Sequence, residues 1–221
     1  MMVAVVNGQE TESPPWAGRL RELLSVMNGL ARGSDETLRA LRQEADAVGA
    51  PLLLVGGIAV IRHGYTRTTD DRDALVSYRH APALAERLSD HDDWDRVERG
   101  LYAFVYRPTG VEVDFLVSGD LMNLGSPYRF PEPDELETAD RLEGIPVIGL
   151  HDLIYFKLLA GRMRDLADIM ELCKRHLQEI DANKVFARLE ADDETMRARF
   201  LEILQKAPQE LENERRFGGG D

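Results

Sequence analysis

The stretch LLLVGGIAVIRHGYTRTTDDRDALV, residues 52–76, decides how this 221-residue chain is interpreted. It opens with a fully apolar run, which favours a buried strand. A glycine pair follows directly, and glycine lets a backbone turn tightly or approach a ligand. In order, the stretch predicts a strand (52–55), a Gly56-Gly57 turn, a short helix (58–62), an Arg67-Thr68-Thr69 turn and a second strand (71–76).

Two acids, Asp71 and Asp73, open the second predicted strand. Residues two apart in a strand point to the same face, so these carboxylates should lie side by side. Like charges at that spacing repel unless a cation or a shared proton lies between them. Mg²⁺ is the usual solution, because it prefers oxygen ligands.

A third acid lies in the segment 111–117, which reads VEVDFLV. Glu112 and Asp114 share one face of this predicted strand, and either acid could reach the Asp71/Asp73 pair from a neighbouring strand. Three carboxylates around Mg²⁺ suit phosphoryl transfer, with the third accepting a proton from the attacking hydroxyl.

Composition narrows the class of protein. The formal net charge is −13, which argues against broad, charge-driven binding of nucleic acid. The single cysteine, Cys173, excludes an intrachain disulfide. We see neither a signal peptide nor a run of about 20 apolar residues that could span a membrane, so a cytoplasmic location is expected.

The remaining pattern predicts an α+β fold, with a small mixed β-sheet flanked by helices and a C-terminal helical region. Helical spacing is found at 16–30, 35–48 and 82–88, and strand signals at 94–97, 101–106, 111–117 and 145–148. Further helices are expected at 150–160, 163–177, 182–189 and 193–206. The expected organisation is a loose segment (1–15), an α/β core with N-terminal helices (16–149), helices packed on that core (150–207) and a disordered tail (208–221).

These motifs resemble the nucleotidyltransferase superfamily typified by DNA polymerase beta. The resemblance is to its small bacterial branch of AbiEii-like toxins and aminoglycoside nucleotidyltransferase-like proteins. The matching residues are Gly56, Gly57, His63, Gly64, Arg67, Thr69, Asp71 and Asp73, then Asp114, and finally the helix signature KLLAGRMRDLAD at 157–168. The resemblance covers about residues 50–175.

The resemblance implies a role for each matched group. Asp71 and Asp73 would hold Mg²⁺, and Asp114 would complete the metal site and activate the acceptor hydroxyl. The nucleotide-binding set would be Gly56, Gly57, Arg67, Thr69 and Lys157, with the glycines at the triphosphate and the cations offsetting its charge. On the residues alone, Lys157 could equally be a solvated helix residue, and Arg162, Arg164, Asp165 and Asp168 could form a surface ion-pair network.

The sequence differs from the family pattern at two positions. Arg72 lies between the paired acids, where relatives carry an apolar residue, and would need a partner such as Asp70 or access to solvent. Ile58 follows Gly57, where many relatives carry serine. The alternative hypothesis is therefore a catalytically silent protein of the same fold, acting as a binding or regulatory module of the toxin–antitoxin type.

The leading hypothesis is a Mg²⁺-dependent nucleotidyltransferase that moves a nucleoside monophosphate from an NTP to a hydroxyl and releases pyrophosphate. The sequence leaves the acceptor open among tRNA, a protein and an aminoglycoside-like small molecule. An acidic surface mildly suits cationic aminoglycosides. A partner protein or a homodimer is also compatible with the sequence.

Overall fold

The computed structural model describes residues 5–6, 9–10, 35–98, 102–123 and 125–217. The chain forms two units, Met1–Asp35 and Glu36–Asp221. In the first, strands β1 (Val5–Val6) and β2 (Gln9–Glu10) pair antiparallel. The helix expected at 16–30 lies outside the described residues.

The second unit contains both strands and helices up to residue 148 and only helices after it. Its strands are β3 (Leu52–Leu54), β4 (Asp71–Val76), β5 (Trp94–Arg96), β6 (Ala103–Tyr106), β7 (Val111–Val117), β8 (Thr138–Leu142) and β9 (Ile145–Ile148). Its helices are α2 (Glu36–Ala47), α3 (Gly56–Arg62), α4 (Ala81–Ser89), the 3-10 turn η1 (Pro133–Glu135), α5 (Leu150–Ala160), α6 (Met163–Arg175), α7 (Ala182–Phe186) and α8 (Glu194–Phe217).

The seven strands form one mixed sheet in the order β5-β6-β7-β4-β3-β9-β8. The central strand β4 runs parallel to β7 and antiparallel to β3, while β6 and β7, both expected as strands, pair antiparallel. The α+β fold with a mixed sheet is therefore confirmed.

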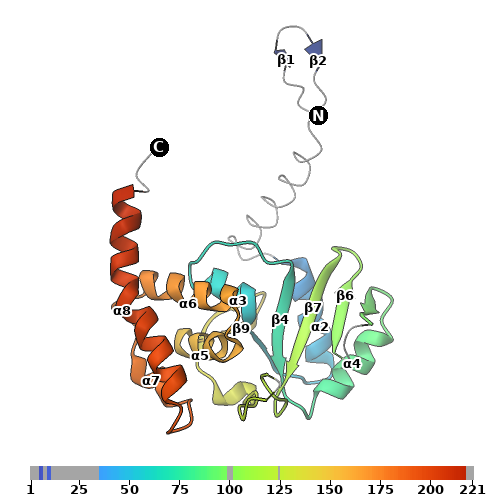
Figure 1. Ribbon diagram of the computed structural model, residues 1–221. Coiled ribbons are helices and arrows are strands. Elements are labelled where there is room, and N and C mark those ends of the chain that lie inside the picture. The colour runs from blue at the N-terminus through green and yellow to red at the C-terminus, as the bar shows by residue number, and fades with distance from the viewer. Residues whose placement is uncertain (1–4, 7–8, 11–34, 99–101, 124, 218–221) are drawn as a thin grey trace. The chain divides into compact units, whose positions relative to one another are not determined.

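Burial follows the sequence pattern of each element. All three residues of β3 are buried, as expected of an apolar strand at the centre of a sheet. Helix α5 is apolar on nearly all sides, and eight of its eleven residues are buried, which makes it the central helix of the C-terminal region. Figure 1 shows α5, α6, α7 and α8 grouped on one side of strands β4 and β7, with α4 at the β6 side of the sheet.

Helix α8 corrects the expected boundary of the tail. Residues from 208 onward were expected to be disordered, but α8 continues through Pro208 to Phe217. Proline removes one backbone donor, yet the helix beyond it is supported by the i,i+4 pair of Glu212 with Arg216 and by an ion pair between Glu214 and Lys174 of α6. These contacts extend the ordered helix by almost three turns.

The edge strand β8 has no counterpart in the sequence analysis. Four of its five residues are exposed, and only Leu142 is buried. Its pairing with β9 also carries a register irregularity between Thr138 and Arg141. Among the described residues, the structure contains no helix that is both long and apolar enough to cross a bilayer.

Candidate active site

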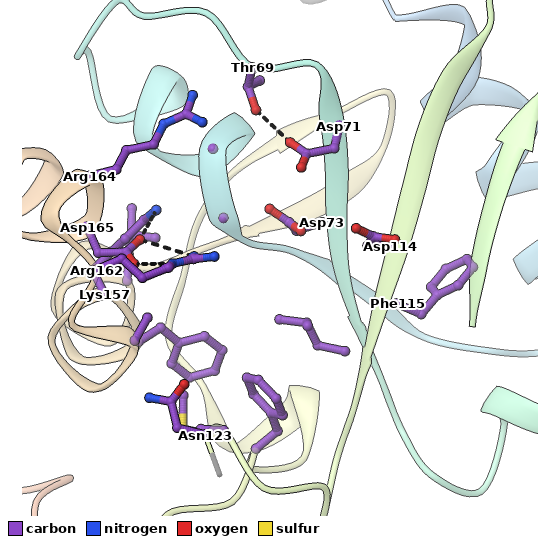
Figure 2. Close-up of a pocket in the computed structure, with 18 of the residues that line it drawn as sticks. Thr69, Asp71, Asp73, Asp114, Phe115, Asn123, Lys157, Arg162, Arg164 and Asp165 are labelled. Atoms are coloured by element: carbon purple, nitrogen blue, oxygen red, sulfur yellow. Dashed lines mark hydrogen bonds and ion pairs between the residues drawn. The ribbon is translucent and has the colours of Figure 1, made fainter. Parts of the chain in front are cut away.

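The three predicted catalytic acids come together through the register of two parallel strands. Asp71 pairs with Glu112 and Asp73 pairs with Asp114 across β4 and β7. Because Asp71 and Asp73 lie two apart, all three side chains reach one face of the sheet (Figure 2). One carboxylate oxygen from each lies within 4.8 Å of those of the others. Of the two acids that β7 offered, Asp114 is the one in this cluster.

The carboxylate of Asp73 carries the clearest electrostatic signature. Burial, together with the charges of Asp71 and Asp114, raises its pKa to about 6, although a hydrogen bond from the Gly57 N–H and the charge of Lys157 act against the rise. Three carboxylate donors with mutual repulsion fit a hard divalent cation, because the cation removes the repulsion and takes oxygen ligands. Asp71, Asp73 and Asp114 are the residues that would hold it.

The glycine pair before α3 is required by close contacts with this cluster. Gly56 has a left-handed backbone with φ +60°, and a Cβ there would lie 1.7 Å from Asp73 Oδ2. A Cβ at Gly57 would lie 2.4 Å from Thr69 Oγ1. The Thr69 hydroxyl in turn donates to Asp71 Oδ1 at 2.8 Å, so it orients one carboxylate of the cluster.

A second charged cluster faces the acids from α5 and α6. Lys157 Nζ lies 2.9 Å from Asp165 Oδ1 and 2.8 Å from Asp168 Oδ2. Arg67, from the segment before β4, contacts Asp168 with Nε at 2.9 Å, and Arg162 contacts Asp165 with Nε at 2.6 Å. Both aspartates are only 1% exposed, so this is a buried network and the hypothesis of a surface network is wrong for them.

Lys157 is likewise buried, at 6% exposure, which excludes a solvated lysine. The pKa of Asp165 shows that neighbouring cations stabilise its negative charge. Burial alone would raise its pKa, but hydrogen bonds from Arg162 and Lys157 outweigh burial and lower it. The sequence identified Lys157, whereas Arg162 and Arg164 were not expected to face the acids. Arg164 donates to the Thr68 carbonyl at 2.7 Å and lies on the same wall.

Both clusters line one cavity of about 680 Å³, a size typical of small-molecule sites. Every residue of the predicted site lines this cavity: Gly56, Gly57, Arg67, Thr69, Asp71, Asp73, Asp114 and Lys157. Aromatic and apolar side chains complete its wall, including Leu116, Phe130 and Phe156, and no sequence pattern marked them for this place. They come from separate elements that only the fold brings together.

The three remaining motif positions lie in supporting places. His63 Nε2 donates to the Ile148 carbonyl at 2.8 Å, which holds the ring against β9. Arg72 is 2% exposed on the other face of β4, so it does not reach solvent, and its Nη1 donates to the Asp71 carbonyl at 3.1 Å. Ile58 is fully buried. Neither departure from the family pattern removes a carboxylate from the cluster.

Comparison with known proteins assigns the fold. No protein-family model and no curated protein sequence matches the chain. Among solved structures, the crystal structure of an antigenic nucleotidyltransferase-like protein from Paracoccidioides brasiliensis matches with a TM-score of 0.55 and 18% identity, covering 78% of this chain and 88% of that one. The likeness shows that the chain has the nucleotidyltransferase-like fold.

Weaker likenesses are found to an antibiotic-resistance factor, ANT(2'')-Ia. Its solution structure matches with a TM-score of 0.43 and 16% identity, over 82% of this chain and 99% of that one. Its crystal structure with adenylyl-2''-tobramycin matches with a TM-score of 0.45 and 16% identity, over 75% and 95%. The present chain is thus a protein of nucleotidyltransferase-like fold with a cluster of three aspartates in its cavity.

Proposed function

We propose that this protein is a Mg²⁺-dependent nucleotidyltransferase that transfers a nucleoside monophosphate from an NTP to a hydroxyl acceptor. The observation that carries the proposal is the cluster of Asp71, Asp73 and Asp114, with carboxylate oxygens within 4.8 Å of one another in a large cavity. A cationic wall that includes Lys157 and Arg162 faces this cluster and suits a triphosphate.

In this proposal each residue has a defined task. Asp71 and Asp73 hold the cation, which when bound neutralises the triphosphate and the leaving pyrophosphate. Asp114 takes the proton of the acceptor hydroxyl. The oxygen of that hydroxyl forms a bond to the α-phosphorus while the bond from this phosphorus to pyrophosphate breaks. Thr69 fixes the Asp71 carboxylate through its 2.8 Å hydrogen bond. Lys157, Arg67 and Arg162 offset the charge of the phosphates.

The wall cations are held in place before any ligand arrives. Lys157 and Arg67 each contact Asp168, so little side-chain freedom is lost when a phosphate binds. The side chain of Arg162 is 76% exposed although its Nε contacts Asp165, so its guanidinium remains accessible from solvent. An arginine that is oriented by Asp165 and still accessible from solvent suits contact with the outer phosphates of an NTP.

The proposal is tested with each labelled NTP, Mg²⁺ and a pool of tRNA, protein and small polyols including aminoglycosides. We expect transfer of label by the wild type, and a loss of about 100- to 10,000-fold in Asp114→Ala, which removes the proposed base. Asp70→Asn is the matched control, because Asp70 is an exposed acid outside the cluster and this variant should keep wild-type activity.

Binding separates the proposal from the catalytically silent alternative. NTP with Mg²⁺ should raise the melting temperature of the wild type, since a ligand that binds only the folded state stabilises it. Absence of both a thermal shift and label transfer for all four NTPs would refute the nucleotidyltransferase proposal. NTP binding without transfer to any acceptor would leave a nucleotide-binding module.

A further inference from the structure

Part of the cavity wall has no role in binding phosphates. Away from the charged clusters, its wall is aromatic and apolar. The described residues that form this part include Leu116, Met122, Phe130, Leu153, Phe156 and Ala160. Phe130 and Phe156 lie with ring centroids 5.6 Å apart and interplanar angle 60°. A flat ring is the natural occupant of such a surface, because ring faces stack on aromatic side chains.

Helix α5 connects this apolar surface to the cationic wall. Leu153, Phe156, Lys157 and Ala160 all line the cavity, and they follow the i, i+3, i+4, i+7 spacing of a single helix face. A ligand with phosphates near Lys157 can therefore extend along α5 and place a ring beside Phe156. An NTP has this shape, with its base at the far end from the outer phosphates.

One amide side chain lies at the apolar end. Asn123 lines the cavity and stands beside its aromatic residues (Figure 2). Its segment is well held, because Met122 N donates to the Tyr128 carbonyl at 3.0 Å and Phe130 N donates to the Asp120 carbonyl at 2.9 Å. These backbone hydrogen bonds fix described residues on both sides of Asn123 in the segment after β7.

The orientation of the Asn123 amide follows from a single hydrogen bond. Its Nδ2 donates one of its two N–H groups to the Leu159 carbonyl of α5, which fixes the plane of the amide. No described residue donates to its Oδ1, which leaves this oxygen as an acceptor for a ligand. A fixed acceptor at the edge of an apolar surface favours a ring that presents an N–H group, and disfavours a ring that presents a carbonyl oxygen there.

We infer that Asn123, with Phe130 and Phe156, forms the nucleobase pocket and selects an NTP whose base carries an amino group at purine C6 or pyrimidine C4, as adenine and cytosine do, over guanine and uracil, which carry a carbonyl oxygen at that position. This inference rests on the proposed function, because it takes the phosphates to lie at the cationic wall. The Asn123 Oδ1 accepts from the amino group, while Phe130 and Phe156 contact the face of the ring.

The first test uses the unaltered protein and needs no acceptor. Binding of ATP, CTP, GTP, UTP and purine riboside triphosphate, which is ATP without its amino group, is measured by calorimetry with Mg²⁺. We expect ATP or CTP to bind about tenfold more tightly than its oxo-bearing counterpart, as the gain or loss of one well-placed hydrogen bond predicts. Purine riboside triphosphate lacks the amino group, so it should not bind more tightly than GTP.

Two matched variants separate edge recognition from stacking. Asn123→Leu removes the acceptor and should abolish the preference among bases. Phe130→Leu keeps an apolar side chain but removes the ring, so it should weaken all NTPs by a similar factor, since stacking tolerates any base. Melting temperatures of both variants show whether the fold is kept, and the comparison of natural NTPs with the analogue does not depend on either variant.

The outcomes distinguish this inference from the proposed function. If NTPs bind with Mg²⁺ but equally, or GTP or UTP binds best, the base pocket is refuted while nucleotidyl transfer stands. If Asn123→Leu leaves NTP binding unchanged and alters only the KM of an acceptor, the apolar surface belongs to the acceptor and the inference is likewise refuted. If no NTP binds to the wild type, the proposed function itself fails.

Discussion

Two groups of aspartates lie at or beside the cavity, and the pKa shift of one member has opposite directions in the two groups: the pKa of Asp165 is lowered and that of Asp73 is raised. Asp165 and Asp168 are 1% exposed and are contacted by Lys157, Arg67 and Arg162 at 2.6–2.9 Å. The carboxylates of the β4/β7 cluster face one another instead, and the pKa of Asp73 is raised to about 6. The first cluster is complete in the folded chain, whereas the second gains from an added cation.

Removing an acid from the compensated cluster should have the largest effect on stability. Asp168→Ala leaves Lys157 and Arg67 buried without this partner, so we expect the free energy of unfolding to fall by about 3–5 kcal/mol in urea titrations. Asp95→Ala is the control, because the Asp95–Arg107 pair is more than half exposed on both sides and should contribute little to stability. Equal losses in the two variants would contradict the comparison.

Removing the charge of Asp73 should change the free energy of unfolding in the opposite direction. The pKa of Asp73 is about 6 when folded against an ordinary value of 3.8, so ionisation opposes folding above pH 6 and has no effect below pH 3.8. We therefore expect Asp73→Asn to raise the free energy of unfolding by about 1–3 kcal/mol at pH 8 without divalent cations.

The rise in the free energy of unfolding caused by Asp73→Asn should shrink between pH 6 and pH 4, because the Asp73 carboxylate of the folded wild type takes up a proton in this range. Urea titrations of both proteins at several pH values, with chelator present, measure this. A stabilisation independent of pH would show that charge repulsion is not its cause. Asp70→Asn, at an exposed acid outside the cluster, should change stability little at any pH.

The pH should also change the affinity of the acidic cluster for a divalent cation, by less than the stability changes above. Because a cation must displace the proton from Asp73, its affinity should fall by about tenfold for each pH unit below 6 and change little above pH 7. Calorimetric titration with Mn²⁺ or Mg²⁺ between pH 5 and pH 8 measures this. An affinity that stays constant across that range would mean that Asp73 is not a ligand of the cation.

The acidic cluster could be predicted because its geometry follows from local rules. Asp71 and Asp73 are two apart in a strand, and the glycine turn before them is visible in the sequence. The contribution of Asp114 needed one further assumption, that β7 lies beside β4, and the resemblance supplied it. The structure pairs Asp73 with Asp114 directly.

The rest of the site could not be predicted from local patterns. Whether Asp165 and Asp168 lie on a surface or in a core depends on how α6 packs against α5 and against the segment that carries Arg67. Strand β8 shows no alternation because four of its residues are exposed, and the end of α8 is helical partly through the contact of Glu214 with Lys174. For Asp168 and for the end of α8, the deciding partner is remote in the sequence.

The contact of Asp168 with Arg67 has a consequence for how this protein can change over time. It joins the C-terminal helices to the loop that leads into the strand bearing Asp71 and Asp73. The helical region is therefore not a freely exchangeable module. A recombination event that replaced it would have to bring an equivalent acid, or leave an arginine buried beside the very residues on which chemistry depends.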